Sequence, residues 1–414
     1  MSASTPSASS APTGWLHAPR TLAWLVLVCA VLLALRKPWA LHTPQLWAED
    51  GSIFLTQDEQ MGLRAFFEPY NGYLHLLPRL IAWIASHTAD VAWWPTIYNG
   101  LAFAINVALF ARLASRRVEL PGKVWLMLAF VLVVGTGDVL INVTNLQWVT
   151  AFFLVLQLFT ARAETWPQRL GDLMILAVVG LNGPFAIVLL PVFAWRAGRE
   201  RSLDAGVALA VIAGCAAAQG FFLLRAGLSL EGNTAAFRPL MFFSILGSRL
   251  VTWPIFGPVA VRAWPQWMHA TLGMVVIAPL LWRTLRPDPQ RNARLTVATI
   301  FVLITLASLY RVRADTWARD DLVNGDRYFY IPRVLLAWLL IWETASASRI
   351  VAWLARGLCV LGVVTHAPHF ILPAPPDYKW AAHCDPIRRG VPANISTLPE
   401  GWWIEYPGRP PEKR

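Results

Sequence analysis

The sequence predicts an all-α integral membrane protein, a polytopic bundle of about 11 transmembrane helices with interfacial or re-entrant helices on its outer face. Of the 414 residues, 56% are hydrophobic and 14% are charged. Because a soluble chain of this size carries about a quarter charged residues, these residues cannot all pack inside a water-soluble globule. Many of the 22 tryptophans flank apolar runs, where amphipathic rings favour the headgroup layer.

Apolar runs of about 16 to 22 residues recur along the chain, and this length spans a hydrocarbon core of about 30 Å. The expected spans are 21–36, 91–111, 124–141, 145–162, 170–182, 183–195, 203–224, 265–282, 294–310, 328–343 and 349–366. The pair 170–182 and 183–195 is short for two upright crossings and could be one long, bent element broken at Asn182-Gly183-Pro184. Prolines and arginines interrupt 73–88 and 237–258, which predicts interfacial or re-entrant helices there.

The arginines and lysines in the short loops predict which side of the membrane each loop and terminus faces. Compact basic loops lie within 112–123, 162–169, 196–201 and 283–294. Since such loops face the cytoplasm, we expect a cytoplasmic N-terminus and an extracytoplasmic C-terminus in a bacterial-type inner or plasma membrane. The net charge of +11 is spread over these loops, which indicates the bilayer as partner and not nucleic acid.

Three regions follow from this topology. Residues 1–20 form a disordered cytoplasmic tail, 21–366 form the transmembrane bundle, and 367–414 form a short extracytoplasmic tail. Within the bundle, the outer face holds the 37–73 loop, the interfacial segment 73–88 and the 311–327 loop. The polar residues of these outer segments are the candidates for chemistry.

The first outer loop carries two adjacent carboxylates, Glu49 and Asp50, between Trp47 and Phe54. A carboxylate within hydrogen-bond reach of an acceptor hydroxyl can act as a general base. Two neighbouring acids also repel, which raises one pKa toward neutrality. The alternative is a pair of loop acids that only solvate the helix end; the aromatic setting favours a buried site, with Asp50 as the expected base.

Two further clusters of polar residues on the outer face could bind sugar hydroxyls, because their side chains offer both hydrogen-bond donors and acceptors. The predicted substrate-binding residues are Tyr70, Asn71, His75, Asn145, Gln147 and Trp148. An aromatic belt with a helix-entry histidine would explain the first three equally well, and a helix cap would explain the other group.

Arginines in and after the 311–327 loop suit the oxygens of a phosphate, which a guanidinium fork can bind in pairs. The candidates are Arg319, Arg327 and Arg333. Arg333 falls nearly two turns inside a span, where a charge is expensive and marks a functional site by default. The alternative is an arginine–carboxylate lattice with nearby aspartates such as Asp326 that only holds the loop.

These residues resemble the GT-C superfamily of polytopic membrane glycosyltransferases. The resemblance rests on Glu49-Asp50 after the first span, the Tyr70–His75 entry into an interfacial segment and Arg327-Tyr328-Phe329-Tyr330 at a late span. It implies transfer of a sugar from a polyprenyl-phosphate donor to a glycan or lipid acceptor, with inversion, in the synthesis of a cell-envelope polysaccharide.

The same resemblance gives each group a role. Asp50 or Glu49 would deprotonate the acceptor, and Arg319, Arg327 or Arg333 would stabilise the leaving phosphate. No soluble-nucleotide motif or zinc spacing occurs, and a donor delivered through lipid needs none. No metal ligand is assigned, although adjacent carboxylates can hold a divalent ion. The chain differs from many members in lacking a large soluble C-terminal domain.

A transporter or flippase for a lipid-linked or anionic solute is the competing class. Broken helices near Gly183-Pro184 and within 239–256 would serve it, because half-helix ends form binding sites at the bilayer midplane. The predicted acids cluster at one surface instead, which favours the enzyme. A catalytically inactive scaffolding relative is the third possibility.

Overall fold

Helices make up most of the structure, a computed structural model that describes residues 19–135, 137–227, 238–311 and 325–408. Five of its helical segments are long and apolar enough to cross a bilayer: Val91–Ala114, Leu203–Arg225, Pro239–Ala263, Arg291–Arg311 and Arg349–His369. Large apolar side chains such as Trp24, Leu224 and Val275 are exposed on the outside of the bundle, as lipid-facing side chains are. The chain is therefore a mostly helical membrane protein.

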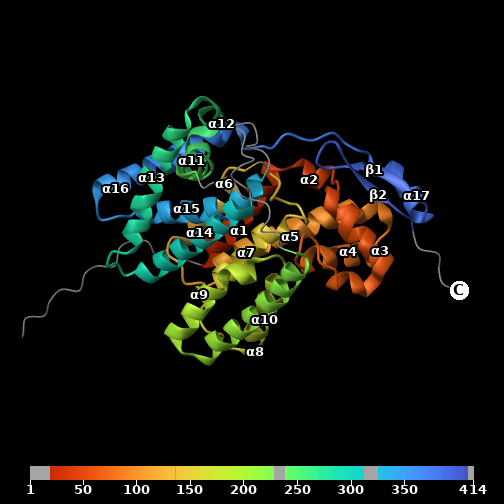
Figure 1. Cartoon of the computed structure of the whole chain (residues 1–414), viewed down its shortest axis with the longest axis horizontal. Coiled ribbons are helices and arrows are strands. Elements are labelled where there is room, and N and C mark those ends of the chain that lie inside the picture. The colour runs from red at the N-terminus through yellow and green to blue at the C-terminus, as the bar shows by residue number, and fades with distance from the viewer. Residues whose placement is uncertain (1–18, 136, 228–237, 312–324, 409–414) are drawn as a thin grey trace, which may run out of the picture.

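The centre of the bundle is α7 (Leu146–Gln157), of which every residue is buried. A helix that is apolar on all sides is stable only when other helices surround it. Its neighbours are α5 (Trp94–Ala114), α8 (Trp166–Gly180), α9 (Phe185–Glu200) and α15 (Tyr330–Glu343). The helices α1 (Pro19–Arg36), α6 (Lys123–Leu132) and α14 (Arg291–Arg311) also appear near the middle of Figure 1. Phe130 packs edge-on against Phe152 and Trp338, with ring centroids 4.6 and 5.6 Å apart, and so joins α6, α7 and α15.

The region 166–200 forms two antiparallel helices, α8 (Trp166–Gly180) and α9 (Phe185–Glu200). Its turn lies beside α4 (Leu76–Thr88), where Asn182 accepts a hydrogen bond from the backbone of Leu77. The far ends of both helices return to the end of α7: Arg196 donates to the Gln157 carbonyl, and Arg112 joins the Gln157 side chain to Asp172. The region is therefore two separate helices with a break between Gly180 and Phe185. Together with α10 (Leu203–Arg225) these helices form the lower group in Figure 1.

The predicted span 124–141 is wrong in its second half, because α6 ends at Leu132. Two buried cations bind backbone carbonyls at the end of α6 and in the segment that follows it. The guanidinium of Arg36 donates to the Val131 carbonyl, and the ammonium of Lys37 donates to those of Gly137 and Leu140, at 3.2 and 2.6 Å. The described residues after Leu132 therefore form an irregular connection into α7.

Residues 239–263, expected as an interfacial or re-entrant element, form a continuous helical segment bent at two places. It comprises α11 (Pro239–Gly247), a π-helical turn (Ser248–Thr252) and α12 (Trp253–Ala263), with Gly257 at φ 83°. It packs on α13 (Gln266–Thr284), and a Cβ built on Gly247 would lie 1.7 Å from the His269 carbonyl oxygen. Only glycine allows this approach, as in helix pairs with small residues at their interface.

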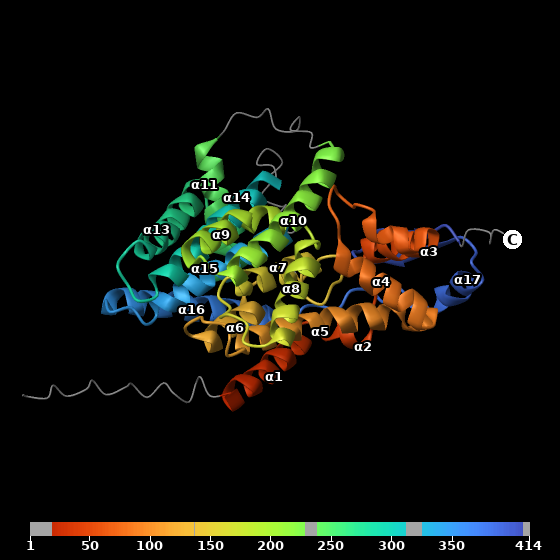
Figure 2. The same ribbon diagram turned by 90° about the horizontal axis from the view of Figure 1, so that it is seen from below.

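The N-terminal loop and the C-terminal tail meet beside α4. The loop contains α2 (Trp39–His42) and α3 (Thr56–Met61); the tail leaves α16 (Arg349–His366) and reaches α17 (Cys384–Arg388) and an antiparallel hairpin, β1 (Ala393–Thr397) and β2 (Trp402–Tyr406). Figures 1 and 2 both show the tail crossing the molecule to lie next to the loop. The Leu398 amide donates to the Leu46 carbonyl and the Ala48 amide donates back to Leu398, so the hairpin fixes the segment before the predicted acids.

Candidate functional site

Asp50 is a buried carboxylate at the start of a π-helical turn (Asp50–Leu55), and its side chain holds that turn to the segment just before α7. Its Oδ1 accepts a hydrogen bond of 2.7 Å from the Thr144 hydroxyl, and its Oδ2 accepts one of 3.1 Å from the Trp47 amide. The residue is 1% exposed. Burial raises the pKa of Asp50 to about 7, and its two hydrogen bonds offset only part of this effect.

Glu49 is the half-buried neighbour of Asp50 and faces a different group of side chains. The Tyr70 hydroxyl donates to its Oε1 at 3.4 Å. Its Oε2 is enclosed and has no hydrogen-bond partner among the described residues. Burial, and then the nearby Glu49 charge, raise the pKa of Tyr70 to about 12, so the phenol stays protonated and remains a donor. Glu49 therefore offers a carboxylate oxygen that can accept a hydrogen bond.

The predicted turn at 70–75 is present and brings Tyr70 to Glu49. Tyr70 and Tyr73 pair through their backbones across Asn71 and Gly72, both of which have positive φ. Gly72 makes this conformation inexpensive. Asn71 is exposed, whereas His75 is 3% exposed. The His75 ring stacks on Tyr73, and its Nδ1 donates a hydrogen bond to the Tyr73 carbonyl. Burial lowers the pKa of His75 to about 3, so its imidazole is neutral at physiological pH.

The predicted group at the start of α7 lies on the same side of the bundle. Asn145 is buried at the first turn, where its Nδ2 donates to the Asp138 carbonyl at 3.0 Å. Gln147 is buried as well. Trp148 packs edge-on against Tyr328, with centroids 5.1 Å apart, and its indole N–H has no partner among the described residues. Trp148 thus connects the start of α7 to the segment that contains Arg327.

The predicted arginines have three different outcomes. Arg319 lies outside the described residues. Arg327 is half-buried over the Tyr328 ring, at 5.5 Å, and lies close enough to Glu49 and Asp138 to feel their charge. Arg333 is 2% exposed and enclosed by acceptors.

The contacts of Arg333 match the alternative of an ionic lattice. Its Nη2 lies 2.6 Å from Oδ1 of Asp326, its Nε donates to the Arg249 carbonyl and its Nη1 donates to the Val134 carbonyl. The Arg249 side chain approaches the same Asp326 oxygen, at 3.6 Å. Of the described arginines that were predicted to bind phosphate, only Arg327 faces Glu49.

Several residues beside the acids were not predicted. Thr144 binds Asp50, and Lys37 is a buried cation near Asp50 and Asp138. Asp138 and Arg36 also line a small cavity of about 10 Å³ that reaches Asp326 and Tyr330. Lys37 carries a sequence signal, a cation directly after an apolar run with acids in the following loop. Nothing in the sequence separates Thr144 from the polar residues around it.

Within the described residues, no three His, Cys, Asp or Glu side chains lie together in a way that could hold a metal ion. Comparisons with protein-family models, with curated proteins and with solved structures found no match to this chain. The case for a function therefore rests on the geometry of the site.

Proposed function

We propose that the chain is a membrane glycosyltransferase that transfers a sugar from a polyprenyl-phosphate donor to an extracytoplasmic glycan or lipid acceptor. The observation that carries the proposal is Glu49, an enclosed carboxylate with an unpartnered oxygen, flanked by the Tyr70 phenol and the Arg327 guanidinium. A base, a hydroxyl donor and a cation within one region are what glycosyl transfer onto a hydroxyl requires.

The topology that we propose has about 11 crossings, with the N-terminus in the cytoplasm and the C-terminus outside. In that orientation Glu49 and Asp50 face outward and the basic loops face the cytoplasm. An extracytoplasmic site has access to donors carried by lipid. The described part of the chain contains no glycine-rich phosphate loop at this site, which agrees with such a donor.

Each residue has a step in the proposed reaction. The Glu49 carboxylate takes the proton of the acceptor hydroxyl, whose oxygen attacks the anomeric carbon from the side opposite the phosphate. The bond between that carbon and the phosphate oxygen breaks, its electron pair leaves with the lipid phosphate, and the sugar is inverted. Arg327 stabilises the developing negative charge on the phosphate.

The contacts favour Glu49 over Asp50 as the base, although Asp50 was the expected one. Both Asp50 oxygens already accept hydrogen bonds, whereas the Glu49 Oε2 has no hydrogen-bond partner among the described residues. An acceptor hydroxyl could reach Asp50 only after the Thr144 contact opened. Asp50 then acts as a positioning residue that anchors the Glu49 loop to the segment just before α7.

A transfer assay with labelled polyprenyl-phosphate sugars in membranes tests this proposal. Glu49→Gln removes the base and should lower transfer by about 10²- to 10⁴-fold, as loss of a general base does. Asp50→Asn should lower transfer by a smaller factor than Glu49→Gln does. Glu400→Gln, an exposed glutamate in the tail, is the matched control and should transfer as wild type does.

Full transfer by Glu49→Gln, by Asp50→Asn and by their double variant would exclude a catalytic role for both acids. Movement of the labelled lipid across the membrane by wild type, with no sugar transferred to any acceptor, would favour the transporter instead. The buried Arg249–Asp326–Arg333 group would then be the first place to look for its binding site.

A further inference from the structure

A second pocket lies at the opposite end of the bundle from Glu49, where α7, α8, α9 and α10 meet. Its volume is about 120 Å³. Arginines and aspartates line its polar part, and the apolar part is lined by Leu173, Leu176, Leu203, Val207 and Ala208. The mixture of cations and hydrocarbon in one pocket suits an amphipathic ligand.

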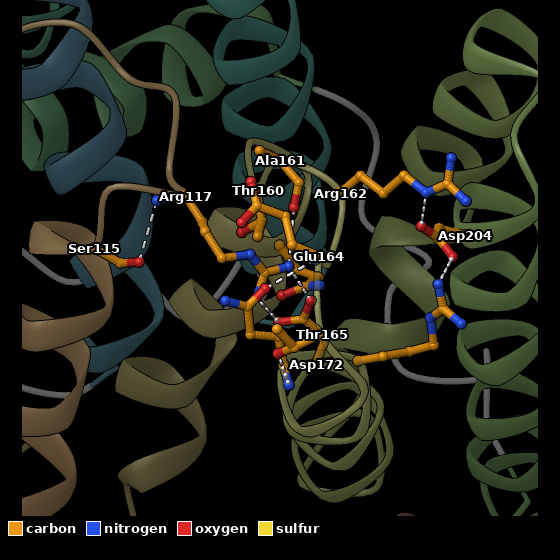
Figure 3. Close-up of polar contacts among 12 residues, drawn as sticks. Ser115, Arg117, Thr160, Ala161, Arg162, Glu164, Thr165, Asp172 and Asp204 are labelled. Atoms are coloured by element: carbon orange, nitrogen blue, oxygen red, sulfur yellow. Dashed lines mark hydrogen bonds and ion pairs between the residues drawn. The ribbon is translucent and has the colours of Figure 1, made fainter.

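The inner arginines of this region are occupied. Arg117 and Arg112 both bind Asp172, at 2.5 and 2.8 Å, and Figure 3 shows Arg117 beside that aspartate. Arg196 donates to the Gln157 and Thr160 carbonyls and pairs with Glu200. These contacts hold the helix ends together and leave these three arginines little capacity for a ligand.

The outer arginines are not saturated. Arg162 and Arg169 share one carboxylate, that of Asp204, at 2.8 and 3.4 Å (Figure 3). Among the described residues, the Arg169 Nε has no hydrogen-bond partner. The exposed Arg162 side chain contacts Asp204 through its Nε, which leaves its terminal nitrogens facing solvent. A guanidinium with free N–H groups binds phosphate oxygens well, because its planar fork matches their spacing.

Charge in this region favours an anion. Five arginines lie here: Arg112, Arg117, Arg162, Arg169 and Arg196. Opposing them are Asp172, Asp204, Glu200 and the exposed Glu164, so positive charge stays in excess.

The rim of the pocket shows where that anion comes from. Trp166, Leu170 and Leu203 are 67%, 48% and 77% exposed, and all three lie next to the outer arginines. In a membrane protein, exposed tryptophan and leucine beside cations mark the headgroup layer. A soluble anion would make no favourable contact with this apolar rim or with the hydrocarbon lining between α8 and α10.

We propose that this pocket binds an anionic phospholipid, with its phosphate on Arg162 and Arg169 and an acyl chain against Leu173 and Val207. Basic pockets between membrane helices bind anionic headgroups in this way. The site is separate from the proposed transferase site, and its occupancy does not depend on catalysis.

Native mass spectrometry and thermal melting of the purified, delipidated full chain in detergent test the proposal. Phosphatidylglycerol should bind and raise the melting temperature, whereas phosphatidylcholine should not. Arg162→Gln/Arg169→Gln should weaken phosphatidylglycerol binding by about 30-fold, since each arginine near such a headgroup contributes roughly five-fold. Arg286→Gln/Arg291→Gln removes the same charge from exposed positions and should bind as wild type does.

Equally weakened phosphatidylglycerol binding in both double variants would overturn the proposed binding site, because binding would then depend only on the general surface charge. Equal stabilisation by glycerol 3-phosphate would overturn a lipid ligand in favour of a soluble one. If Arg162→Gln/Arg169→Gln does not fold, Val207→Trp serves instead. This change fills the apolar lining and leaves both arginines in place, so it should also lower binding of phosphatidylglycerol, and unchanged binding would refute the proposal.

Discussion

Asp50→Asn should make the protein more stable at pH 8 and leave it nearly unchanged at pH 4. The carboxyl has a pKa of about 7 in the folded protein, against 3.8 for an unperturbed aspartate. The folded protein therefore holds the proton more tightly than the unfolded chain, so the free energy of unfolding falls as pH rises between these two values. Above pH 7 the free energy of unfolding has lost the full contribution of the protonated Asp50.

The size of the effect follows from the difference in pKa. About three pKa units at 1.36 kcal/mol each give a penalty of about 4 kcal/mol for the ionised Asp50. Asparagine carries no charge, but its amide nitrogen cannot accept the bond that Oδ2 receives from the Trp47 amide, which costs about 1 kcal/mol. The variant should thus be more stable by about 3 kcal/mol at pH 8.

Equilibrium unfolding in mixed micelles with rising SDS fraction, followed by tryptophan fluorescence at pH 4, 6 and 8, measures this difference. Asp377→Asn, at an exposed tail position, is the control and should show no pH-dependent difference from wild type. A stability difference between wild type and Asp50→Asn that is the same at all three pH values would refute the reasoning, because Asp50 would then titrate as an exposed carboxyl does.

Three other changes test separate parts of the structure. Glu343→Ala leaves the buried Arg294 and the half-buried Arg283 without their carboxylate and should cost about 3 to 5 kcal/mol in the same unfolding assay; a cost below 1 kcal/mol would contradict these ion pairs. Gly247→Val places a side chain where a backbone carbonyl lies and should abolish the folded state or lower its melting temperature, while normal melting would contradict the close α11–α13 approach. In a background without cysteine, Gly401→Cys should react with an impermeant maleimide from outside and Arg199→Cys only from inside; the reverse pattern would overturn the proposed orientation.

The sequence predicted the helices better than their ends. Apolar length alone located α5, α10, α14 and α16 to within a few residues, because a lipid-facing helix must be apolar for most of its length. The sequence-based span extended α6 to residue 141, because hydropathy does not show that Arg36 and Lys37 bind backbone carbonyls at the end of α6 and after it. Hydropathy also could not show that α7 is enclosed on all sides, because helices that face lipid and helices that face other helices are equally apolar.

The sequence by itself determined that this is a helical membrane protein and that Glu49, Asp50, Tyr70 and Arg327 are its candidates for chemistry. It did so because apolar length and polar groups at helix ends are local properties. Only the tertiary structure decided how the two acids differ: the Thr144 contact buries Asp50, while Glu49 faces Tyr70. Burial and hydrogen bonding depend on residues distant in the chain, and no spacing between neighbours encodes them.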